Sequence, residues 1–452
     1  MDHEVFKETR KIEFSLIWRE HLKKGPSKNL QNGISQKIEN HEPDGKYPQT
    51  AHQPDAKLVQ MLHKWHCGVG NLNFLLQIQE TKLLKSIPHG DTLNYLLEKL
   101  PPEALGRIRT QMIHGLIRQK CFENERLLDK YHLVGADGTE LFSRDQRHCD
   151  SCLTRTVKKG KRDKKQEVLQ YYHRVLEAKL LCSSGMVLSV ETEFIANEAR
   201  VASISEESFK QDCELNAFKR LEKQLKADFP QLSICLLLDG LFAGKPVFDI
   251  CKKNGWGYLI TFKEGSMPAV YQEFLDLLKL VPENQSIEKE EDGTQRVYRW
   301  VCDIEYEGHR LNVLECVEIQ PDGTSTRFVW LTNLSVTQEN CIALAKAGRR
   351  RWKIENEGFN MQKNGGYGLE HMYSEDPVAL KNFYVLLQMA HAIRQLLEKG
   401  NLLKEILKVY GSLKNFTLKL WSSFTQAVFD SEEWEALKIF LSKPRQIRLN
   451  TG

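Results

Sequence analysis

The sequence lacks long hydrophobic runs and a strong excess of charge of either sign. No uninterrupted apolar stretch approaches the ~20 residues that a membrane-spanning helix needs, and the longest candidate, Ile234 to Leu238, runs directly into Asp239. The first residues, MDHEVFKETRK, mix charges and contain no apolar segment of the kind found in secretory signals. The net charge of +4 does not by itself indicate a polyanionic partner. These absences favour a cytoplasmic protein and leave the distribution of charge as the more informative property.

Cysteine is also sparse, with 11 residues in 452, an odd number spread along the chain. Disulfide scaffolds are short and dense in cysteine, so this usage predicts reduced thiols in a cytosol. Hydrophobic residues make up 41% and charged residues 27% of the chain, which allows a sizeable core and excludes wholesale disorder.

Changes in composition along the chain predict five segments. They are a mostly mobile polar arm (1–56), a helical module (57–130), a mixed α/β core (131–284), a β-strand insertion (285–335) and a helical C-terminal region (336–452). The order within the core is β-β-β-α-β-α-β-α, and the repeated Gly turns of the insertion are typical of hairpins. The sequence therefore predicts an α/β fold, with a mixed sheet and flanking helices.

Two aspartates occupy matching positions, because Asp137 and Asp239 each follow an apolar run and each precede a glycine. We expect both to lie just past the end of a strand, where the loops of α/β sheets open a binding crevice. Two carboxylates at one edge repel each other unless a cation lies between them, and hard oxygen ligands suit Mg²⁺ or Mn²⁺. The alternative is ordinary Asp-Gly turn chemistry.

A third carboxylate, Glu355, lies in a segment predicted to continue one long helix to about Asn364. Helical spacing places Glu355 on one face with Trp352 and Phe359, and Arg351 precedes it by four residues. A carboxylate between aromatic side chains on a packed face needs an ionic partner. This favours a metal ion or Arg351 as the partner, while an ordinary Arg–Glu pair on a solvated helix is the simpler alternative.

The order Asp, Asp, Glu, with a β-insertion before the Glu helix, resembles the DDE transposases of bacterial insertion sequences. Arg351-x3-Glu355 and the phrases RWKIENEGFN and LEH are similar to the group with a Tyr-x2-Arg-x3-Glu-x6-Lys signature. The resemblance covers roughly residues 130 to 395. It departs from the signature at two positions, since Gly348 takes the place of the Tyr and the lysine falls one residue late, at Lys363.

The resemblance implies a ribonuclease H-like core in which Asp137, Asp239 and Glu355 bind two divalent ions, Mg²⁺ or Mn²⁺, and catalyse phosphodiester cleavage and strand transfer. It implies DNA contacts by Arg351 and Lys363. It also implies double-stranded DNA partners, namely the terminal inverted repeats of an element and its target, a homodimer, and a place at the nucleoid of a bacterium. The helical module at 57–130 would bind the element ends.

Two basic runs fit a DNA partner. The segment from Arg155 to Lys165 holds seven basic residues and one acidic residue, and Lys346 to Lys353 holds five basic residues in eight. A run rich in lysine and glycine contacts phosphate rather than base edges. The phosphate contacts that we expect from the first run are Lys158, Lys159, Lys161 and Arg162. The alternative for any charge run is a solvated face.

A second possible metal site begins with His148-Cys149-x2-Cys152. One CxxC supplies half of the four ligands that a structural zinc site needs. Cys149, Cys152 and His173 supply three of them, with His148 or Cys182 as the fourth. The alternative is that the cysteines are small buried hydrophobic residues.

Three functions remain open from the sequence. The first is a DNA transposase, the second is a metal-dependent nuclease without strand transfer, and the third is a catalytically silent relative that binds DNA. All three carboxylates are present, which favours an enzyme. Nothing in the sequence separates strand transfer from simple cleavage.

Overall fold

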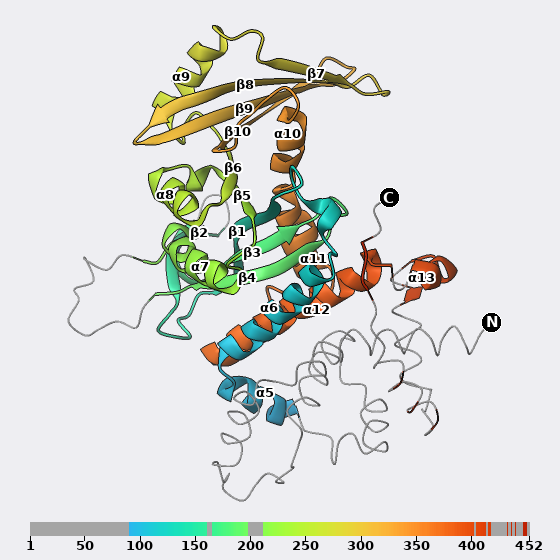
Figure 1. Cartoon of the computed structure of the whole chain (residues 1–452). Helices are drawn as coiled ribbons and strands as arrows, with labels where there is room; N and C mark the ends of the chain where they lie inside the picture. The colour runs from blue at the N-terminus through green and yellow to red at the C-terminus, as the bar shows by residue number, and fades with distance from the viewer. Residues whose placement is uncertain are drawn as a thin grey trace, which may run out of the picture. The chain divides into compact units, whose positions relative to one another are not determined.

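The computed structural model describes residues 90–160, 165–197, 211–401, 404–412, 415–416 and 446–449, together with residues 432, 435 and 439. The predicted polar arm (1–56) and the first part of the predicted helical module (57–89) lie outside the described residues. The chain divides into two compact units (Figure 1). We call Phe122–Met361 the sheet unit, and the described parts of Met1–Cys121 and Gln362–Gly452 the helical unit.

The sheet unit is built on one ten-stranded mixed sheet, whose path runs β2-β3-β1-β5-β6-β10-β9-β8-β7, with β4 paired to β3. Only the β1–β5 and β5–β6 pairs are parallel, and the other pairs are antiparallel. The strands are β1 (His132–Arg144), β2 (Leu153–Lys159), β3 (Gln166–Leu181), β4 (Val187–Ile195), β5 (Ile234–Leu238), β6 (Gly257–Thr261), β7 (Gln285–Lys289), β8 (Gln295–Tyr306), β9 (His309–Ile319) and β10 (Ser325–Thr332).

The short apolar run ICLLL forms β5, the central parallel strand, and every one of its residues is buried. This confirms the expectation of a strand covered on both faces, since such strands are continuously apolar rather than alternating. The parallel register pairs Gly135 of β1 with Leu237 of β5. The same offset, continued by two residues, places Asp137 level with Asp239.

The four strands between residues 285 and 332 extend the same sheet. β10 pairs with β6 through Trp330, Leu331 and Thr332, and β9, β8 and β7 follow in antiparallel order. Short hairpin connections join β7 to β8, β8 to β9 and β9 to β10. Each contains a glycine at positive φ, namely Gly293, Gly308 and Gly323 in that order. The β-rich segment therefore lengthens the core sheet on the β6 side.

Helical segments cover both faces of the β1 region. On one face, α7 (Glu214–Asp228) packs on β3 and β4, and on the other a π-helix, η4 (Ile354–Asn360), packs on β1 and β4. Gly135 faces η4, since a Cβ there would meet Ile354, and Gly138 faces α7, since a Cβ there would meet Glu214. The remaining segments of this unit are η1 (Glu123–Glu125), η3 (Gly240–Phe242), α8 (Lys245–Asn254), α9 (Pro268–Leu278) and α10 (Cys341–Arg349).

The helical unit contains α5 (Gly90–Lys99), α6 (Pro102–Arg118), most of α11 (Met361–Asn364), α12 (Pro377–Lys399) and α13 (Lys404–Tyr410). Leu97 and Leu105 of the first two helices pack against Leu386 and Met389 of α12 in one apolar cluster. The buried Asn382 side chain donates to the backbone oxygens of Leu97 and Leu100, at 2.7 and 2.6 Å, which satisfies the end of α5. The described helices of 57–130 thus share a core with the C-terminal region.

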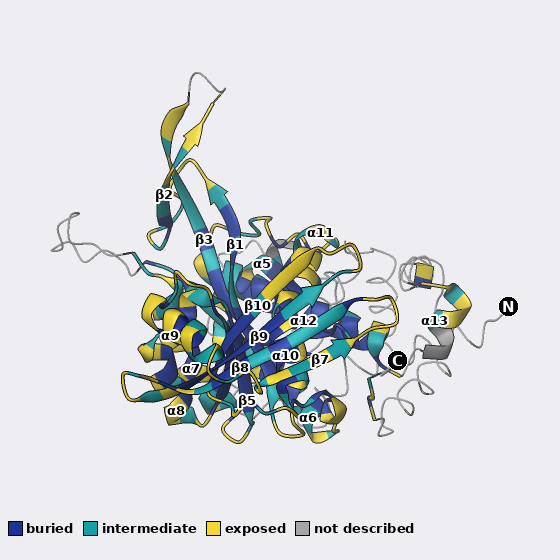
Figure 2. Ribbon diagram, turned by 90° about the horizontal axis from the view of Figure 1, so that it is seen from above, coloured by how far each residue is buried: buried dark blue, intermediate teal, exposed yellow. Residues whose placement is uncertain are grey.

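Figure 2 shows the buried residues concentrated in the sheet and a hairpin that extends away from it. We call this hairpin the arm; it consists of β2 and the start of β3, paired from Leu153–Tyr172 to Lys159–Gln166. Within the residues that the structure describes, no helix combines the length and the apolar character that crossing a membrane requires.

Candidate active site

Asp137 lies inside β1 and not past its end, which corrects the expectation from the sequence. Asp-Gly makes no turn here because the strand continues through Gly138 to Arg144, paired with β3 with one register shift between Glu140 and Phe142. A glycine is needed at 138, since a Cβ would lie 2.3 Å from Oε1 of Glu214. The Gly138 amide donates to Oδ1 of Asp137 at 2.8 Å. The Asp137 side chain therefore projects from the middle of a strand towards the η4 face, as Gly135 does.

Asp239 follows β5 directly, as the sequence predicts, and its backbone is extended. Its Oδ1 accepts a hydrogen bond from the Leu241 amide at 2.9 Å, so the carboxylate caps the short helix η3. The cap fixes the side chain at the edge of the sheet. Strand ends of this kind are where α/β sheets bind their ligands.

Glu355 lies in the π-helix η4 and not in one continuous helix, which is a second correction. α10 ends at Arg349, and the amides of Arg351 and Ile354 donate three residues back, to Gly348 and Arg351, before η4 begins. The tighter turn and the wider one after it change which residues share a face, so Trp352 is 54% exposed while Phe359 is buried. Single-turn π-helices are frequent at functional sites.

Arg351 joins two of the three carboxylates. Its Nη1 atom lies 3.1 Å from Oδ2 of Asp137 and 2.9 Å from Oε1 of Glu355. The Arg351 side chain is 11% exposed and its Nε–H is buried without an acceptor among the described residues. The guanidinium thus supplies the positive charge that the sequence required beside these carboxylates.

The negative charge of Asp239 also acts on Asp137. Burial raises the pKa of Asp137 to about 7, Arg351 opposes that rise, and the negative charges of Glu355 and Asp239 add to it. The three carboxylates come from positions 102 and 116 residues apart in the sequence, and the fold brings them together. We call Asp137, Asp239 and Glu355 the acidic triad.

Two further acidic residues near the triad were missed by sequence reasoning. Glu214 forms an ion pair of 2.5 Å with Arg174. Burial raises the pKa of Glu214, Arg174 opposes this rise, and the charge of Asp239 adds to it. Glu177 is fully buried, pairs across the strands with Asp137 and accepts a hydrogen bond of 2.7 Å from Thr192. The sequence signal for the second was available: Glu177 and Lys179 are charged residues two apart in an otherwise apolar run.

Glu357, two residues after Glu355, has a partner outside the triad. Its Oε1 lies 3.3 Å from the amino group of Lys353. In each of the pairs Lys353–Glu357 and Arg351–Glu355 the carboxylate follows its cation by four residues. The two pairs share no residue. Glu357 is therefore a natural control for substitutions at Glu355.

The basic run from Lys346 to Lys353 is not a free cationic surface. All five of its cations have carboxylate partners inside the sheet unit: Lys346 with Glu288, Arg349 with Glu318, Arg350 with Glu125, Arg351 with the triad and Lys353 with Glu357. The nitrogen–oxygen distances in these pairs are between 2.7 and 3.6 Å. Glu288, Glu318 and Glu125 are distant along the chain, so the sequence could not show these partners. Glu355 and Glu357, in contrast, follow their cations by four residues.

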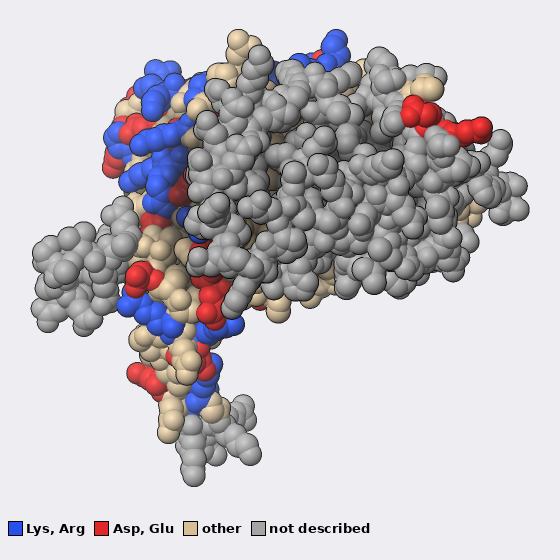
Figure 3. Space-filling view, turned by 90° about the horizontal axis from the view of Figure 1, so that it is seen from below, with Lys and Arg blue, Asp and Glu red and all other residues tan. Residues whose placement is uncertain are grey.

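The described start of the other basic run, Arg155 to Lys159, lies on β2 of the arm. It contains Lys158 and Lys159, two of the expected phosphate contacts. Both are exposed, and they lie 3.7 Å from Glu167 and 2.5 Å from Asp145. Lys161 and Arg162 fall in the segment 161–164, outside the described residues. Figure 3 shows Lys and Arg interspersed with Asp and Glu along this projection.

Lys363, at the lysine position of the resemblance, lies in α11 and belongs to the helical unit. Its amino group pairs with Glu370 at 2.7 Å. The structure therefore provides it with a local partner within its own unit.

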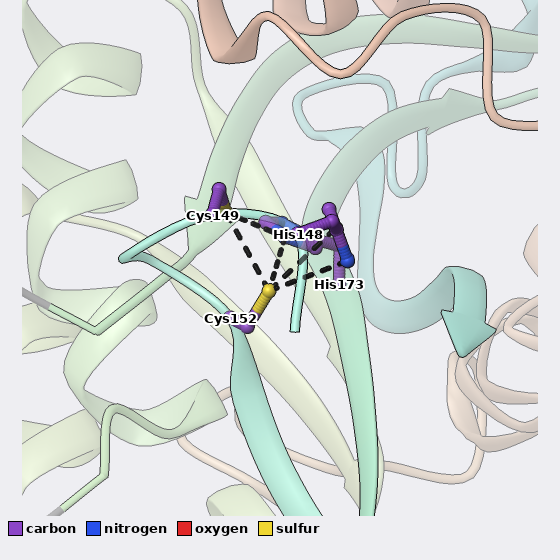
Figure 4. A group of neighbouring side chains, drawn as sticks. All are labelled: His148, Cys149, Cys152 and His173. Carbon is purple, nitrogen blue, oxygen red and sulfur yellow. Dashed lines mark hydrogen bonds between the residues drawn. The ribbon is translucent and has the colours of Figure 1, made fainter. Parts of the chain in front are cut away.

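The predicted zinc ligands come together at the root of the arm (Figure 4). Potential ligand atoms of His148, Cys149, Cys152 and His173 all lie within 4.8 Å of one another. Cys182 is excluded as the fourth ligand, because it follows His173 by nine residues along β3, on the order of 30 Å of extended chain. We call these four residues the His/Cys cluster.

Comparisons with known proteins give a weak structural likeness and no family. No family model matches the chain, and no curated protein matches its sequence. Among solved structures, the chain is similar to a piggyBac transposase in a synaptic complex with hairpin DNA, with a TM-score of 0.38 and 10% sequence identity, over 95% of this chain and 85% of that chain.

Proposed function

We propose that the protein is a DDE transposase, a metal-dependent enzyme that cleaves phosphodiester bonds at DNA ends and joins them to a target. The observation that carries the proposal is the convergence of the acidic triad. Asp137 and Glu355 share one Arg351 nitrogen, at 3.1 and 2.9 Å, and Asp239 raises the pKa of Asp137 from the adjoining strand. Chance pairing on a solvated helix does not account for three carboxylates from three elements.

The donor set fits divalent cations. Three carboxylates are hard oxygen ligands, which Mg²⁺ and Mn²⁺ prefer. Burial, and to a smaller extent the charges of Glu355 and Asp239, raise the pKa of Asp137, and a bound cation would offset both. When bound, two such ions supply activation of the attacking hydroxyl and stabilisation of the leaving oxygen. Asp137, Asp239 and Glu355 would hold them.

The protein's own residues set the geometry of this site. The paired strand β1 fixes Asp137, the η3 cap fixes Asp239, and the π-helix presents Glu355. Arg351 holds two of the carboxylates in place, and its guanidinium adds a positive charge to the site. A phosphate oxygen is an acceptor of the right charge for a guanidinium.

The strand arrangement supports a ribonuclease H-like core for this function. β4, β3 and β1 are antiparallel neighbours, and β5 and β6 then follow β1 in parallel. In the proposal, β7–β10 are an insertion between this core and the Glu355 segment. DNA would be the partner of the arm, and a homodimer would hold two DNA ends.

The test is cleavage of a supercoiled plasmid that carries the DNA flanking the gene, with Mg²⁺ or Mn²⁺, by the full-length protein. Glu355→Gln removes one negative ligand but keeps the size of the side chain, so cleavage should fall by roughly 10²–10³-fold or more because the charge at the metal site is lost. Glu357→Gln is the matched control, two residues away and paired with Lys353; it should cleave as the wild type does.

Equal loss from the two variants, or full cleavage by the Glu355 variant, would overturn the assignment of the third carboxylate. The products separate the remaining functions. Joined plasmid molecules indicate strand transfer, cut DNA alone indicates a nuclease, and DNA binding without any metal-dependent cleavage indicates a silent relative.

A further inference from the structure

The His/Cys cluster draws on three parts of the fold that meet at the root of the arm. His148 and Cys149 lie in the connection after β1, Cys152 directly precedes β2, and His173 lies on β3 (Figure 4). Cys152 and His173 are buried, and the other two are partly exposed. A site that ties together three adjoining segments is suited to hold the hairpin in position.

The distances between the ligand atoms match the edges of a tetrahedron around zinc. Bonds of about 2.3 Å to sulfur and about 2.0–2.1 Å to nitrogen, at tetrahedral angles, separate two sulfurs by about 3.8 Å and a sulfur from a nitrogen by about 3.6 Å. The two sulfurs are 3.5 Å apart, and Nε2 of His173 lies 3.2 Å from Cys149 Sγ and 3.5 Å from Cys152 Sγ. His148 reaches Cys152 Sγ at 3.5 Å through Nδ1.

The surroundings hold the four side chains in place. Phe142 packs on both imidazole rings, with ring centroids 5.2 Å from His148 and 5.3 Å from His173. The Asn197 side chain donates to the backbone oxygen of Cys152 at 2.8 Å, and the Asn197 backbone N–H donates to the backbone oxygen of Ser151. These bonds fix the loop to the segment that follows β4. Supporting contacts of this kind orient the ligands of metal sites.

We propose that His148, Cys149, Cys152 and His173 bind one structural zinc ion that fastens the root of the arm. Two thiolates and two imidazoles complete a closed four-ligand set, which is the composition of structural rather than catalytic zinc sites. The ion joins the β1–β2 connection to β3 and so fixes the direction in which the arm leaves the sheet. The proposal does not depend on the acidic triad or on any DNA chemistry.

The test is elemental analysis of the full-length, untagged protein purified without chelator. We expect about one zinc per chain in the wild type, and a loss of at least about tenfold in Cys152→Ser, because a missing thiolate opens the ligand set. Cys213→Ser is the matched control, since Cys213 is exposed and lies outside the cluster; it should keep its zinc. Wild-type protein without zinc, or full zinc in the Cys152 variant, would overturn the proposal.

Two further measurements on the wild type cover the case in which the variant fails to fold. Cobalt exchanged into the protein should give the intense visible absorption of tetrahedral thiolate coordination. Thiol titration of the denatured protein should count all 11 cysteines. A count of nine, which is eleven minus two, would instead identify a Cys149–Cys152 disulfide and contradict the zinc site.

Discussion

The acidic triad and the His/Cys cluster both gather metal-binding side chains around β1 and its neighbours, yet they differ in how their charge is balanced. The triad contains its own cation, because Arg351 bridges Asp137 and Glu355. The His/Cys cluster consists of thiols and imidazoles that contact one another and pack on Phe142. A site with an internal cation can keep its shape while metal ions come and go. A set of two thiols and two imidazoles is suited to a permanent structural ion.

The two sites also differ in the span of chain that builds them. The cluster is assembled from residues 148 to 173, whereas the triad spans residues 137 to 355. The cluster therefore stabilises local structure around one hairpin, and the triad depends on the whole sheet unit being folded. The predictions that follow run from the largest expected effect to the smallest.

Removing the internal cation should make the triad depend on metal ions. In Arg351→Ala the carboxylates lose their partner in a largely buried site, so the metal-free protein should lose roughly 2–4 kcal/mol of unfolding free energy, with the lower part of the range favoured by the partial exposure of Glu355. Millimolar Mg²⁺ or Mn²⁺ should restore part of the loss, because a ligand that binds only the folded state stabilises it. Urea unfolding with and without the ion measures both effects.

Arg349→Ala is the control for Arg351→Ala. Arg349 is 41% exposed and pairs with Glu318 outside the triad, so its loss should cost at most about 1 kcal/mol and should not respond to the ion. A stability loss in Arg351→Ala that no divalent ion reduces would contradict the idea that the guanidinium occupies the place of a cation.

Removing zinc should affect stability more than removing magnesium does. A zinc-selective chelator should lower the melting temperature of the wild type by about 5–10 °C, corresponding to roughly 2–3 kcal/mol in a unit of this size. Omitting Mg²⁺ should shift it by no more than about 2 °C, since Arg351 already balances the triad. Differential scanning calorimetry of the same preparation measures both shifts. A larger shift on omission of Mg²⁺ than on removal of zinc would contradict a structural role for the His/Cys cluster and an exchangeable ion at the acidic triad.

Asp137→Asn should change how stability depends on pH. Because burial raises the pKa of Asp137 from 3.8 to about 7, its protonated form stabilises the folded state fully below pH 3.8, and this contribution is lost as pH rises to about 7. The variant lacks that loss, so in metal-free buffer its stability relative to the wild type should improve by roughly 1–3 kcal/mol between pH 5 and pH 8. Urea unfolding at several pH values measures the difference.

Asp276→Asn is the comparison for that titration. The hydrogen bond from Lys279 to the exposed Asp276 lowers its pKa, so its contribution changes only below pH 4. Its stability relative to the wild type should be flat from pH 5 to pH 8. A flat difference for Asp137→Asn as well would show that the pKa of Asp137 is not raised, which would contradict the burial and the neighbouring negative charges assigned to it.

The sequence predicted the parts of the triad better than their setting. The β5 run and its following Asp239 could be recognised because a fully buried strand has a continuous apolar pattern. Asp-Gly normally turns, which predicts Asp137 past a strand end, but the pairing with Glu177 and Leu176 that keeps this dipeptide extended comes from a strand distant in sequence. The π-helix around Glu355 could not be predicted, since packing on β1 and β4 selects it rather than local preference.

The charge pairs show the same limit. Both basic runs are visible in the sequence, but their carboxylate partners come from other strands, as Glu288 and Glu318 do for Lys346 and Arg349. In the His/Cys cluster, spacing left His148 and Cys182 equally possible as fourth ligand. The extended geometry of β3 decided between them, because nine residues of strand carry Cys182 far from His173.

The smallest expected effect concerns the arm that the zinc ion would hold. Replacing Lys158 and Lys159 with Ala should weaken DNA binding to a similar degree for every sequence and reduce the slope of log K against log salt by about 1–2, because each phosphate contact contributes about 0.9. Lys245→Ala is the control: Lys245 is similarly exposed and ion-paired, but it lies on α8 with Asp249. Gel shifts of two unrelated duplexes over a salt series measure the slope.

The ion pair between Lys159 and Asp145 predicts a substitution that strengthens DNA binding instead of weakening it. Lys159 is held 2.5 Å from Asp145, so part of its charge is already neutralised before DNA binds. Asp145→Asn should therefore strengthen binding slightly, by less than about 1 kcal/mol, as expected for release of an exposed pair. The same change should leave zinc content and Mg²⁺-dependent cleavage per bound complex unaltered, since Asp145 contacts neither site. If Asp145→Asn and the double lysine variant both weakened binding, the arm would be acting through its shape, and phosphate contact by these lysines would be the wrong explanation.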